Sequence, residues 1–511
     1  MLPELAAFLR DRFGVTLECD PDIIAGFACD SSNLPGMAQA VARPSSPRDC
    51  AVILRACSQA GLPVTLSAGK SNLTGSATPE GGVVLSTVRL ASADGAGGAA
   101  VLVDPETCTV RGAVGMILEE MRREVLRVTD GRLFYPVDPT SRADATVGGT
   151  VICNASGFVP GHGGATREWV RAIELVLPDG ARIRAERGQY LSRAGRFVLE
   201  NGCGRREWPV PQHLRPAIKN AGGPFSAVDG VMDFVDLIVG SEGLFGVLTA
   251  CKLGLRKSPD AVLDLFFSLR DESRALAFYK QVRAHLNGDL GSLGALEYFG
   301  VNCLRYMNHR DLLFHGDDTV GIYLQVPLYG RSLDEAAEEW MSVILESGCG
   351  VQDEAVVLLD SERNWTRFME ARHSLPANAL EVVKHRGAFT IMTDTVVPPD
   401  RFEEFLVFTH RILGEAGMEY LAFGHLGDCH LHFTLLPHRE QLDRGVDLYD
   451  AIVAKSADLG GVYSGEHGTG KRKRKDFLRC YGPAAVEQVR RCKAAVDSGF
   501  VLNRGNVIEA L

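Results

Sequence analysis

Short apolar runs alternate with segments of helical periodicity along the first half of the chain. Ser46-Pro47 is a typical helix start, and the apolar positions 51, 54 and 57 follow it at intervals of three. A second helix is predicted over 115–126. The apolar runs predict strands over 63–67, 82–90, 100–104, 170–177, 181–185 and 247–255. Asp179-Gly180 predicts a hairpin, and residues 1–41 predict an N-terminal helical arm.

The order of elements changes after Lys257-Ser258-Pro259, which we interpret as a domain boundary. Strands are predicted over 262–269, 293–299, 320–326, 354–358, 389–397, 419–425 and 430–436. Helices are predicted over 271–287 and 332–346, and again beyond about residue 440, apart from a glycine-punctuated loop at 460–470. This order is typical of helices layered on an antiparallel, ferredoxin-like sheet. The pattern therefore predicts an α+β protein with two principal domains and a helical tail.

Charge and composition exclude several classes of protein. The chain has 511 residues, and 54 Lys and Arg against 64 Asp and Glu give a net charge of −10, which argues against binding to nucleic acids. No apolar stretch approaches the ~20 residues that a membrane-spanning helix needs. The N-terminal residues also lack the pattern of a secretory signal peptide. The 13 cysteines are dispersed without any C-x-x-C pair, which indicates reduced thiols and no iron–sulfur cluster. These features predict a cytoplasmic protein.

Three glycine-rich segments lie beside predicted strands, at 67–79, 136–157 and 240–249. Glycines and small hydroxyl residues in such places let backbone N–H groups approach a phosphate or a flat ligand. Gly69-Lys70-Ser71 suggests a nucleotide-triphosphate loop, but that motif needs a glycine five residues before Gly69, where Val64 stands. Any one of these segments could simply form a turn without binding a ligand. Together the three predict one extended cofactor.

Histidines are concentrated in the segment 424–433, where His425, His430 and His432 fall within eight positions. In a strand His430 and His432 share one face, and a turn at Gly427-Asp428 would let His425 point to the same side. A second segment, 464–470, supplies Glu466 and His467 on a glycine-rich loop. Imidazoles and a carboxylate are frequent metal ligands, and adjacent side chains rarely bind one ion. We therefore expect one of Glu466 and His467 to be a ligand and the other an acid or base.

Jointly, these segments resemble the FAD-linked 2-hydroxy-acid dehydrogenases and oxidases. This is a branch of the vanillyl-alcohol-oxidase-type flavoproteins that contains D-lactate dehydrogenase, the glycolate oxidase flavin subunit and D-2-hydroxyglutarate dehydrogenase. The resemblance begins near residue 42 and reaches the C-terminus. It implies a two-part FAD-binding domain over 42–257 and a ferredoxin-like antiparallel cap, or substrate domain, over 258–440. The helical segment 441–511 would then return to the flavin.

The resemblance also implies which residues contact FAD. Lys70 stands where the family usually has glycine, so it could add a cation for the diphosphate or be a solvated lysine. His162 does not match the family's attachment sites, so we expect FAD to bind without a covalent bond. The implied FAD-binding residues are Ala68, Gly69, Lys70, Ser71, Asn72, Leu73, Thr74, Gly75, Pro136, Asp138, Thr140, Thr146, Gly149, Asn154, Gly157, Glu242, Gly246, Val247 and Asn503.

The family pattern places metal ligands at His425, His432 and Glu466, for a divalent ion such as Zn or Mn, and the catalytic base at His467. His430 replaces an asparagine and Cys429 a glycine. We expect His430 to face the substrate, as an added ligand, a second proton carrier or a substrate-selecting group.

The substrate carboxylate calls for an arginine. Related enzymes carry one in a helix similar to that of Arg372, and Arg386 is the alternative. The D-2-hydroxyglutarate branch has lysine where this chain has Met392, so a small monocarboxylate is favoured.

The sequence thus predicts a metal-assisted, FAD-dependent dehydrogenase that converts a D-2-hydroxy acid, lactate- or glycolate-like, to the 2-oxo acid. Electrons would pass to a separate iron–sulfur subunit, an electron-transfer flavoprotein or a quinone, and the chain would form a homo-oligomer or join a complex. The basic run 471–475 is interpreted as a solvated face, or as a docking patch for a partner or the membrane surface. Alternatives are a flavin-free metal hydrolase built on His425, His432 and Glu466, and a non-catalytic FAD-binding subunit.

Overall fold

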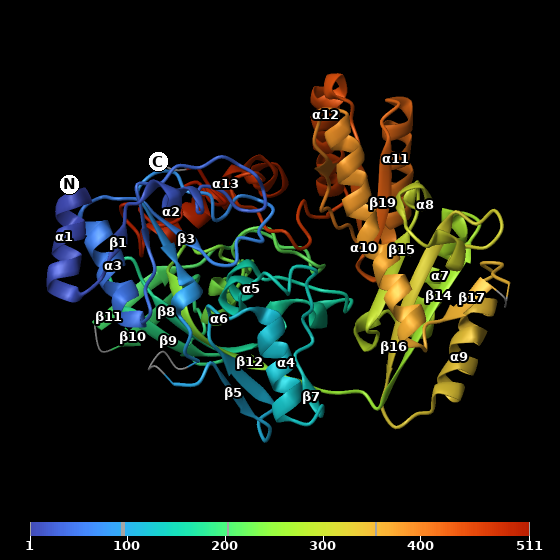
Figure 1. Ribbon diagram of the computed structural model, residues 1–511, viewed down its shortest axis with the longest axis horizontal. Coiled ribbons are helices and arrows are strands. Elements are labelled where there is room, and N and C mark those ends of the chain that lie inside the picture. Colours follow the sequence, from blue (N-terminus) through green and yellow to red (C-terminus); the bar gives the residue numbers. More distant parts are fainter. Residues whose placement is uncertain (1, 94–97, 202–203, 353–354, 510–511) are drawn as a thin grey trace.

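Two bodies lie side by side in the computed structural model, which describes residues 2–93, 98–201, 204–352 and 355–509 (Figure 1). The N-terminal body contains the chain up to about residue 257 and the C-terminal helix α13 (Arg474–Ala494). The second body contains a large sheet and its helices, including α12 (Leu442–Asp458). The short strands β7 (Leu133–Phe134) and β13 (Arg256–Lys257) pair where the chain passes from one body to the other. The predicted α+β class is confirmed.

A small sheet with the order β1-β2-β4-β3 forms the first part of the N-terminal body. Strands β2 (Ala40–Ala42), β3 (Val64–Ser67) and β4 (Val83–Ser86) are parallel, and α3 (Pro47–Gln59), capped by Ser46, connects two of them. The predicted helical arm contains α1 (Leu2–Phe13) and α2 (Pro21–Ala25), but it also supplies β1 (Leu17–Glu18), which pairs with β2. A strand of two residues is too short to leave a periodic signal.

A five-stranded antiparallel sheet forms the second part, in the order β5-β6-β12-β8-β9. Its strands are β5 (Val101–Asp104), β6 (Thr109–Gly112), β8 (Val170–Val176), β9 (Arg182–Glu186) and β12 (Val247–Gly254). The predicted hairpin at Asp179-Gly180 joins β8 to β9. Three helices accompany this part, α4 (Leu118–Val128), α5 (Val147–Cys153) and α6 (Phe234–Ile238), and a separate hairpin pairs β10 (Arg196–Asn201) with β11 (Gly204–Pro209).

Helix α5 was not predicted, because Gly148-Gly149 is a poor helix-forming pair. Tertiary packing, and not helix propensity, makes this segment helical. Thr146 caps the helix by accepting a hydrogen bond from the Gly149 N–H, and a Cβ at Gly148 would lie 2.8 Å from Val114. The glycines therefore allow the helix to approach the neighbouring chain closely.

The second body is built on a seven-stranded antiparallel sheet, which confirms the predicted type of sheet. Its order is β17 (Val356–Leu358), β14 (Ala261–Leu269), β16 (Val320–Leu328), β15 (Ala295–Phe299), β19 (Tyr420–His425), β20 (His430–Leu435) and β18 (Ile391–Met392). Residue 354 of the predicted strand 354–358 lies outside the described residues. One face of the sheet forms a core with three helices, α7 (Glu272–His285), α9 (Leu333–Glu346) and α11 (Phe402–Glu415). The other face of the sheet packs against α10 (Glu362–His385).

Three elements of this body differ from the sequence prediction. Helices α10 and α11 had no predicted counterpart, although the resemblance placed Arg372 in a helix. The predicted strand 389–397 is regular only at Ile391–Met392. Beyond it Thr393, Asp394 and Thr395 are completely buried, and Val396 pairs with Val462 instead of a sheet strand. The chain leaves the sheet where Asp394 accepts hydrogen bonds from the loop 464–470.

The C-terminal segment returns to the first sheet. Val64 donates its N–H to Val501 and accepts one from Asn503, so residues 501–503 run beside β3. The basic run 471–475 does not form the expected solvated face, because Lys473 is buried with its Nζ 2.7 Å from Asp394 Oδ2, and Lys471 Nζ donates to Asn506 Oδ1. Among the described helices, none is both long enough and apolar enough to cross a bilayer.

The buried Lys493 ties α13 to the N-terminal body, because its Nζ donates to Leu244 O, Leu502 O and Asp497 Oδ2 at 2.7–2.9 Å. We expect Lys493→Met to lower the free energy of unfolding in urea by about 3–5 kcal/mol, since Asp497 stays buried without its cation. Lys475→Met removes an exposed pair with Asp450 and should cost about 0–1 kcal/mol. Equal losses in the two variants would contradict this view.

Candidate active site

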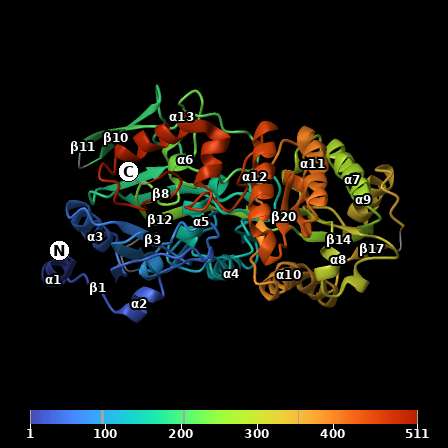
Figure 2. The same cartoon turned by 90° about the horizontal axis from the view of Figure 1, so that it is seen from above.

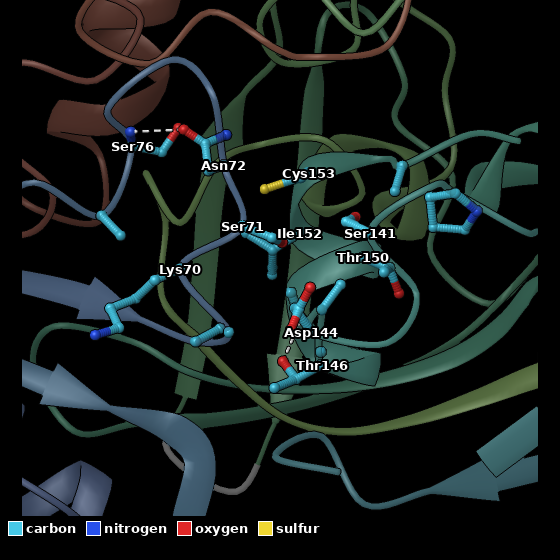
Figure 3. Close-up of a pocket in the computed structure, with 18 of the residues that line it drawn as sticks. Lys70, Ser71, Asn72, Ser76, Ser141, Asp144, Thr146, Thr150, Ile152 and Cys153 are labelled. Atoms are coloured by element: carbon cyan, nitrogen blue, oxygen red, sulfur yellow. Dashed lines mark hydrogen bonds between the residues drawn. The ribbon is translucent and has the colours of Figure 1, made fainter. Parts of the chain in front are cut away.

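One cavity of about 510 Å³ joins the three glycine-rich segments to the histidine cluster. Its wall includes the loop after β3 and helix α5 (Figure 3). Glu242, Gly243, Val247 and Leu248 also line it, as do His425, Glu466 and His467. Sites that lie up to about 400 residues apart in the sequence therefore share one cavity.

Most of the predicted cofactor-binding residues line this cavity. They are Ala68, Gly69, Lys70, Ser71, Asn72, Leu73, Asp138, Thr140, Thr146, Gly149, Gly157, Glu242, Val247 and Asn503. The predicted residues absent from the wall are Thr74, Gly75, Pro136, Asn154 and Gly246.

Several of these absent residues hold the scaffold behind the wall. Thr74 O accepts the N–H groups of Lys471 and Arg472, Asn154 caps the end of α5, and a Cβ at Gly246 would lie 2.6 Å from Val176 O.

Further residues line the cavity that the sequence did not single out. Most of them are neighbours of predicted residues within the same loops, so only their place in these motifs could have indicated them. Ser31 comes from the N-terminal arm and had none. The polar, aromatic and sulfur-bearing members are Ser31, Ser67, Ser76, Thr87, Ser141, Asp144, Thr150, Cys153, Ser156 and Phe158.

Two buried hydroxyls show that the cavity suits a polar ligand. Ser67 Oγ and Ser156 Oγ both belong to residues of the wall, and neither has a hydrogen-bond partner within the described part of the chain. Buried polar atoms are nearly always hydrogen-bonded in native proteins. A cofactor with several acceptor oxygens, such as FAD, would supply the missing partners.

Lys70 does not direct its ammonium group into the cavity. Its side chain points away from the other labelled residues (Figure 3). Its Nζ donates to Gly26 O at 2.6 Å and lies over the Phe27 ring. Its backbone φ of +58° is the conformation for which glycine is favoured. This lysine therefore links the N-terminal arm to the loop and does not place a cation in the cavity.

The histidine cluster sits on one face of the β19–β20 pair. His425 lies opposite His430, His432 follows on the same face, and the ring centroids of neighbouring histidines are 4.6–6.2 Å apart. Between them Leu431 and Phe433 point into the core. The predicted turn at Gly427-Asp428 is confirmed as the connection.

His425, His432 and Glu466 have the geometry of metal ligands. Glu466 Oε2 lies 3.2 Å from His425 Nε2, and Glu466 Oε1 lies 3.2 Å from His432 Nε2. Ligands of one ion are roughly 3–3.5 Å apart. The opposite nitrogens are also fixed, since Nδ1 of His425 donates to Glu297 and Nδ1 of His432 donates to Thr393 O. Such outer hydrogen bonds orient metal-binding imidazoles, so these residues fit a divalent ion.

His467 lies beside this group and also lines the cavity. Its ring stacks on His432 with an interplanar angle of 14°, and its Nε2 is 3.4 Å from Glu466 Oε1. On the other side Nδ1 lies 3.5 Å from Asp394 Oδ2, which also accepts the backbone N–H of His467. The side chains of the adjacent residues Glu466 and His467 therefore lie close together, and the division of roles between them stays a prediction.

Lys219 is a buried cation of this site that no sequence motif revealed. Its Nζ lies 3.3 Å from Glu466 Oε2 and 3.4 Å from Asp428 Oδ2. Burial alone would lower the pKa of Lys219, but the two carboxylates outweigh it and raise that pKa. Likewise burial would raise the pKa of Glu466, but Lys219 and His425 hold it well below its ordinary value. The ligand carboxylate is therefore ionised at neutral pH.

The two candidate arginines are separated by the fold. The guanidinium of Arg372 lies 4.2 Å from the centroid of Phe158, a residue of the cavity wall, and 3.3 Å from Glu297. Arg386 instead pairs with Glu419 and donates to Leu436 O. His430 was expected to face the substrate, but it is completely buried and does not line the cavity.

Comparisons with known proteins agree with this geometry. The fold matches the solved 4-ethylphenol oxidase from Gulosibacter chungangensis with a TM-score of 0.69, over 100% of this chain and 97% of that one, at 15% identity. That likeness defines a vanillyl-alcohol-oxidase-type fold. The models "FAD binding domain" and "FAD linked oxidases, C-terminal domain" match residues 38–186 and 296–507. The chain belongs to the FAD-linked oxidase family and is an FAD-linked oxidoreductase.

Two relatives are similar over nearly their whole length. A D-lactate dehydrogenase from Anaerostipes hadrus is 25% identical over 95% of this chain and 93% of its own. Glycolate oxidase subunit GlcD from Bacillus subtilis is 25% identical over 92% of this chain and 89% of its own. The expected family resemblance is confirmed.

Gly69 tests the glycine-rich loop, because a Cβ there would lie 2.2 Å from Asp144 O and 3.1 Å from Ala145 Cα. We expect Gly69→Ala to displace the loop and to lose most of the bound FAD, measured as the ratio of flavin to protein absorbance. In the control Gly414→Ala the new Cβ meets nothing within 4 Å in helix α11. It should keep its FAD and gain about 0.5–1 kcal/mol of stability. A Gly69→Ala protein with full flavin would contradict the assignment.

Proposed function

We propose that the protein oxidises a small D-2-hydroxy acid, such as lactate or glycolate, to the 2-oxo acid, with FAD as hydride acceptor and a divalent metal as cocatalyst. One observation carries the proposal: the FAD-type loops and the His425–Glu466–His467 group line a single cavity. The names of the relatives, a D-lactate dehydrogenase and a glycolate oxidase subunit, support the substrate class.

The side chains have separate tasks in this proposal. FAD takes up the hydride when it is bound, and the loops 67–79, 136–157 and 240–249 would hold it without a covalent bond. His425, His432 and Glu466 would hold a divalent ion such as Zn or Mn, which acidifies the substrate hydroxyl. His467 accepts that hydroxyl proton at Nε2, since its Nδ1 faces Asp394. General-base catalysis of this kind typically contributes ~10²–10⁴-fold.

Cations at the edge of the cavity would orient the substrate carboxylate. Arg372 rests on Phe158 and offers a planar fork that matches a carboxylate. Lys219 adds positive charge beside Glu466. Met392, at the position where the D-2-hydroxyglutarate branch carries lysine, offers no partner for a second carboxylate. A monocarboxylate therefore fits the site better than a dicarboxylate does.

Electrons would leave through a separate acceptor in the cytoplasm, either an iron–sulfur subunit, an electron-transfer flavoprotein or a quinone. Among the described residues, the clusters with metal-ligand geometry contain no cysteine. A relative that is named as a subunit supports assembly into a complex, and a homo-oligomer is the alternative. Of the two rival functions, the flavin-free hydrolase is contradicted by the matches to both FAD-linked family models.

Anaerobic mixing of the flavoprotein with a panel of D- and L-hydroxy acids tests the function directly. We expect a small D-2-hydroxy monocarboxylate to bleach the oxidised flavin spectrum. His467→Asn should retain FAD but bleach ~10²–10⁴-fold more slowly, because it lacks the base. His162→Ala changes an exposed histidine outside the site and should bleach at the wild-type rate. No bleaching by any acid would favour a non-catalytic FAD-binding subunit, and unchanged bleaching in His467→Asn would remove this residue from the mechanism.

A further inference from the structure

His430 carries a buried ring nitrogen that has no hydrogen-bond partner among the residues that the structure describes. The residue is completely buried, and its Nε2 lies 2.9 Å from Asp394 Oδ1. Because a carboxylate can only accept, Nε2 holds the proton and Nδ1 holds a lone pair. Nδ1 finds no hydrogen-bond partner in the part of the chain that the structure describes. Native proteins rarely leave such a lone pair without a partner, and a water molecule or a bound ion can supply one.

The same arrangement recurs in all three histidines of the cluster. His425 gives one N–H to the Glu297 carboxylate, His432 gives one to Thr393 O, and His430 gives one to Asp394. In each ring the proton is fixed on one nitrogen by an acceptor outside the cluster. The second nitrogen is thereby prepared as a metal ligand.

Position also favours a shared role. The rings of His430 and His432 have centroids 4.6 Å apart, and His430 offers a ligand nitrogen that lies within 4.8 Å of those of His425 and His432 and of a Glu466 oxygen. Gly465 makes room for the ring, because a Cβ at that position would lie 2.8 Å from His430 Cε1. Glycine next to Glu466 therefore lets a third imidazole enter the group.

We propose that His430 is a third histidine ligand, so that His425, His430, His432 and Glu466 together hold the divalent ion. This inference rests on the metal site of the proposed function. Of the three roles that the sequence left open for His430, it selects that of an added metal ligand, and it makes Asp394 the residue that orients its ring. Imidazole donors suit Zn, Fe, Ni and Cu, whereas Mg, Ca and Mn prefer oxygen ligands. Three imidazoles should therefore make the site select the former ions.

Pulsed electron paramagnetic resonance of the Cu²⁺-loaded, FAD-containing protein can count the coordinated imidazoles through their remote nitrogens. We expect three in the wild type and two in His430→Asn. The variant should also bind Zn²⁺ at least ~10-fold more weakly in a competition titration with a chelator, the scale on which disturbed metal sites lose affinity. Both readouts are independent of turnover.

His213→Asn is the matched control, because His213 is also buried and its ring nitrogens also lack hydrogen-bond partners among the described residues. It lies against Phe477 and Tyr481, outside the cluster. It should keep three imidazoles and wild-type zinc affinity. FAD content and thermal midpoint, measured on each variant, report whether the fold is intact. If His430→Asn fails to fold, the wild-type imidazole count decides alone.

The outcomes separate this inference from the proposed function. Two imidazoles in the wild type, or an unchanged count and zinc affinity in His430→Asn, would overturn the role of His430 and leave hydroxy-acid oxidation standing. Three imidazoles in a protein whose flavin no hydroxy acid bleaches would support His430 and overturn the proposed function. No metal binding by the wild type would overturn both the ligand set and the metal-assisted mechanism.

Discussion

The loop 464–470 is held between two buried carboxylates, and the arrangement of the site depends on this. Asp394 accepts the N–H groups of Glu466 and His467 at 3.1–3.2 Å, and Glu242 accepts those of Thr469 and Gly470 at 2.7 Å. Buried carboxylates are costly unless they are fully hydrogen-bonded. The loop has little freedom to move without leaving one of them unpaired, so its two functional side chains are fixed.

The same two carboxylates connect the halves of the molecule. Asp394 follows a strand of the large sheet, whereas Glu242 precedes β12 of the N-terminal body and also binds Ser76 of the loop after β3. That loop in turn contacts the backbone of His467 through Asn72 and Thr74. The cofactor-type loops and the histidine cluster are therefore linked by hydrogen bonds as well as by a common cavity. Seen from above, helix α12 lies close to the boundary between the two bodies (Figure 2).

Pairing of opposite charges explains how so many ionisable groups share a buried site. Glu466 has Lys219 and His425 within ion-pair distance, and Glu297 has His425 and Arg372. Each partner offsets part of the cost of burial, and each holds a ligand or a ring in a single orientation. Removing one member would leave another charge buried and unpaired, so the site behaves as one network.

The sequence alone determined the type of most strands and of the loops at the site, because local patterns encode local chemistry. Alternation in His430-Leu431-His432-Phe433 specifies a strand with histidines on one face, and the glycine-rich segments specify tight loops beside strands. Only the tertiary structure decided which groups meet. Lys219 has no motif, Lys70 turns away to Gly26, and Arg372 rather than Arg386 contacts Phe158 of the cavity wall. Such outcomes depend on contacts between segments far apart in the chain and on the need to pair every buried charge, which no local pattern records.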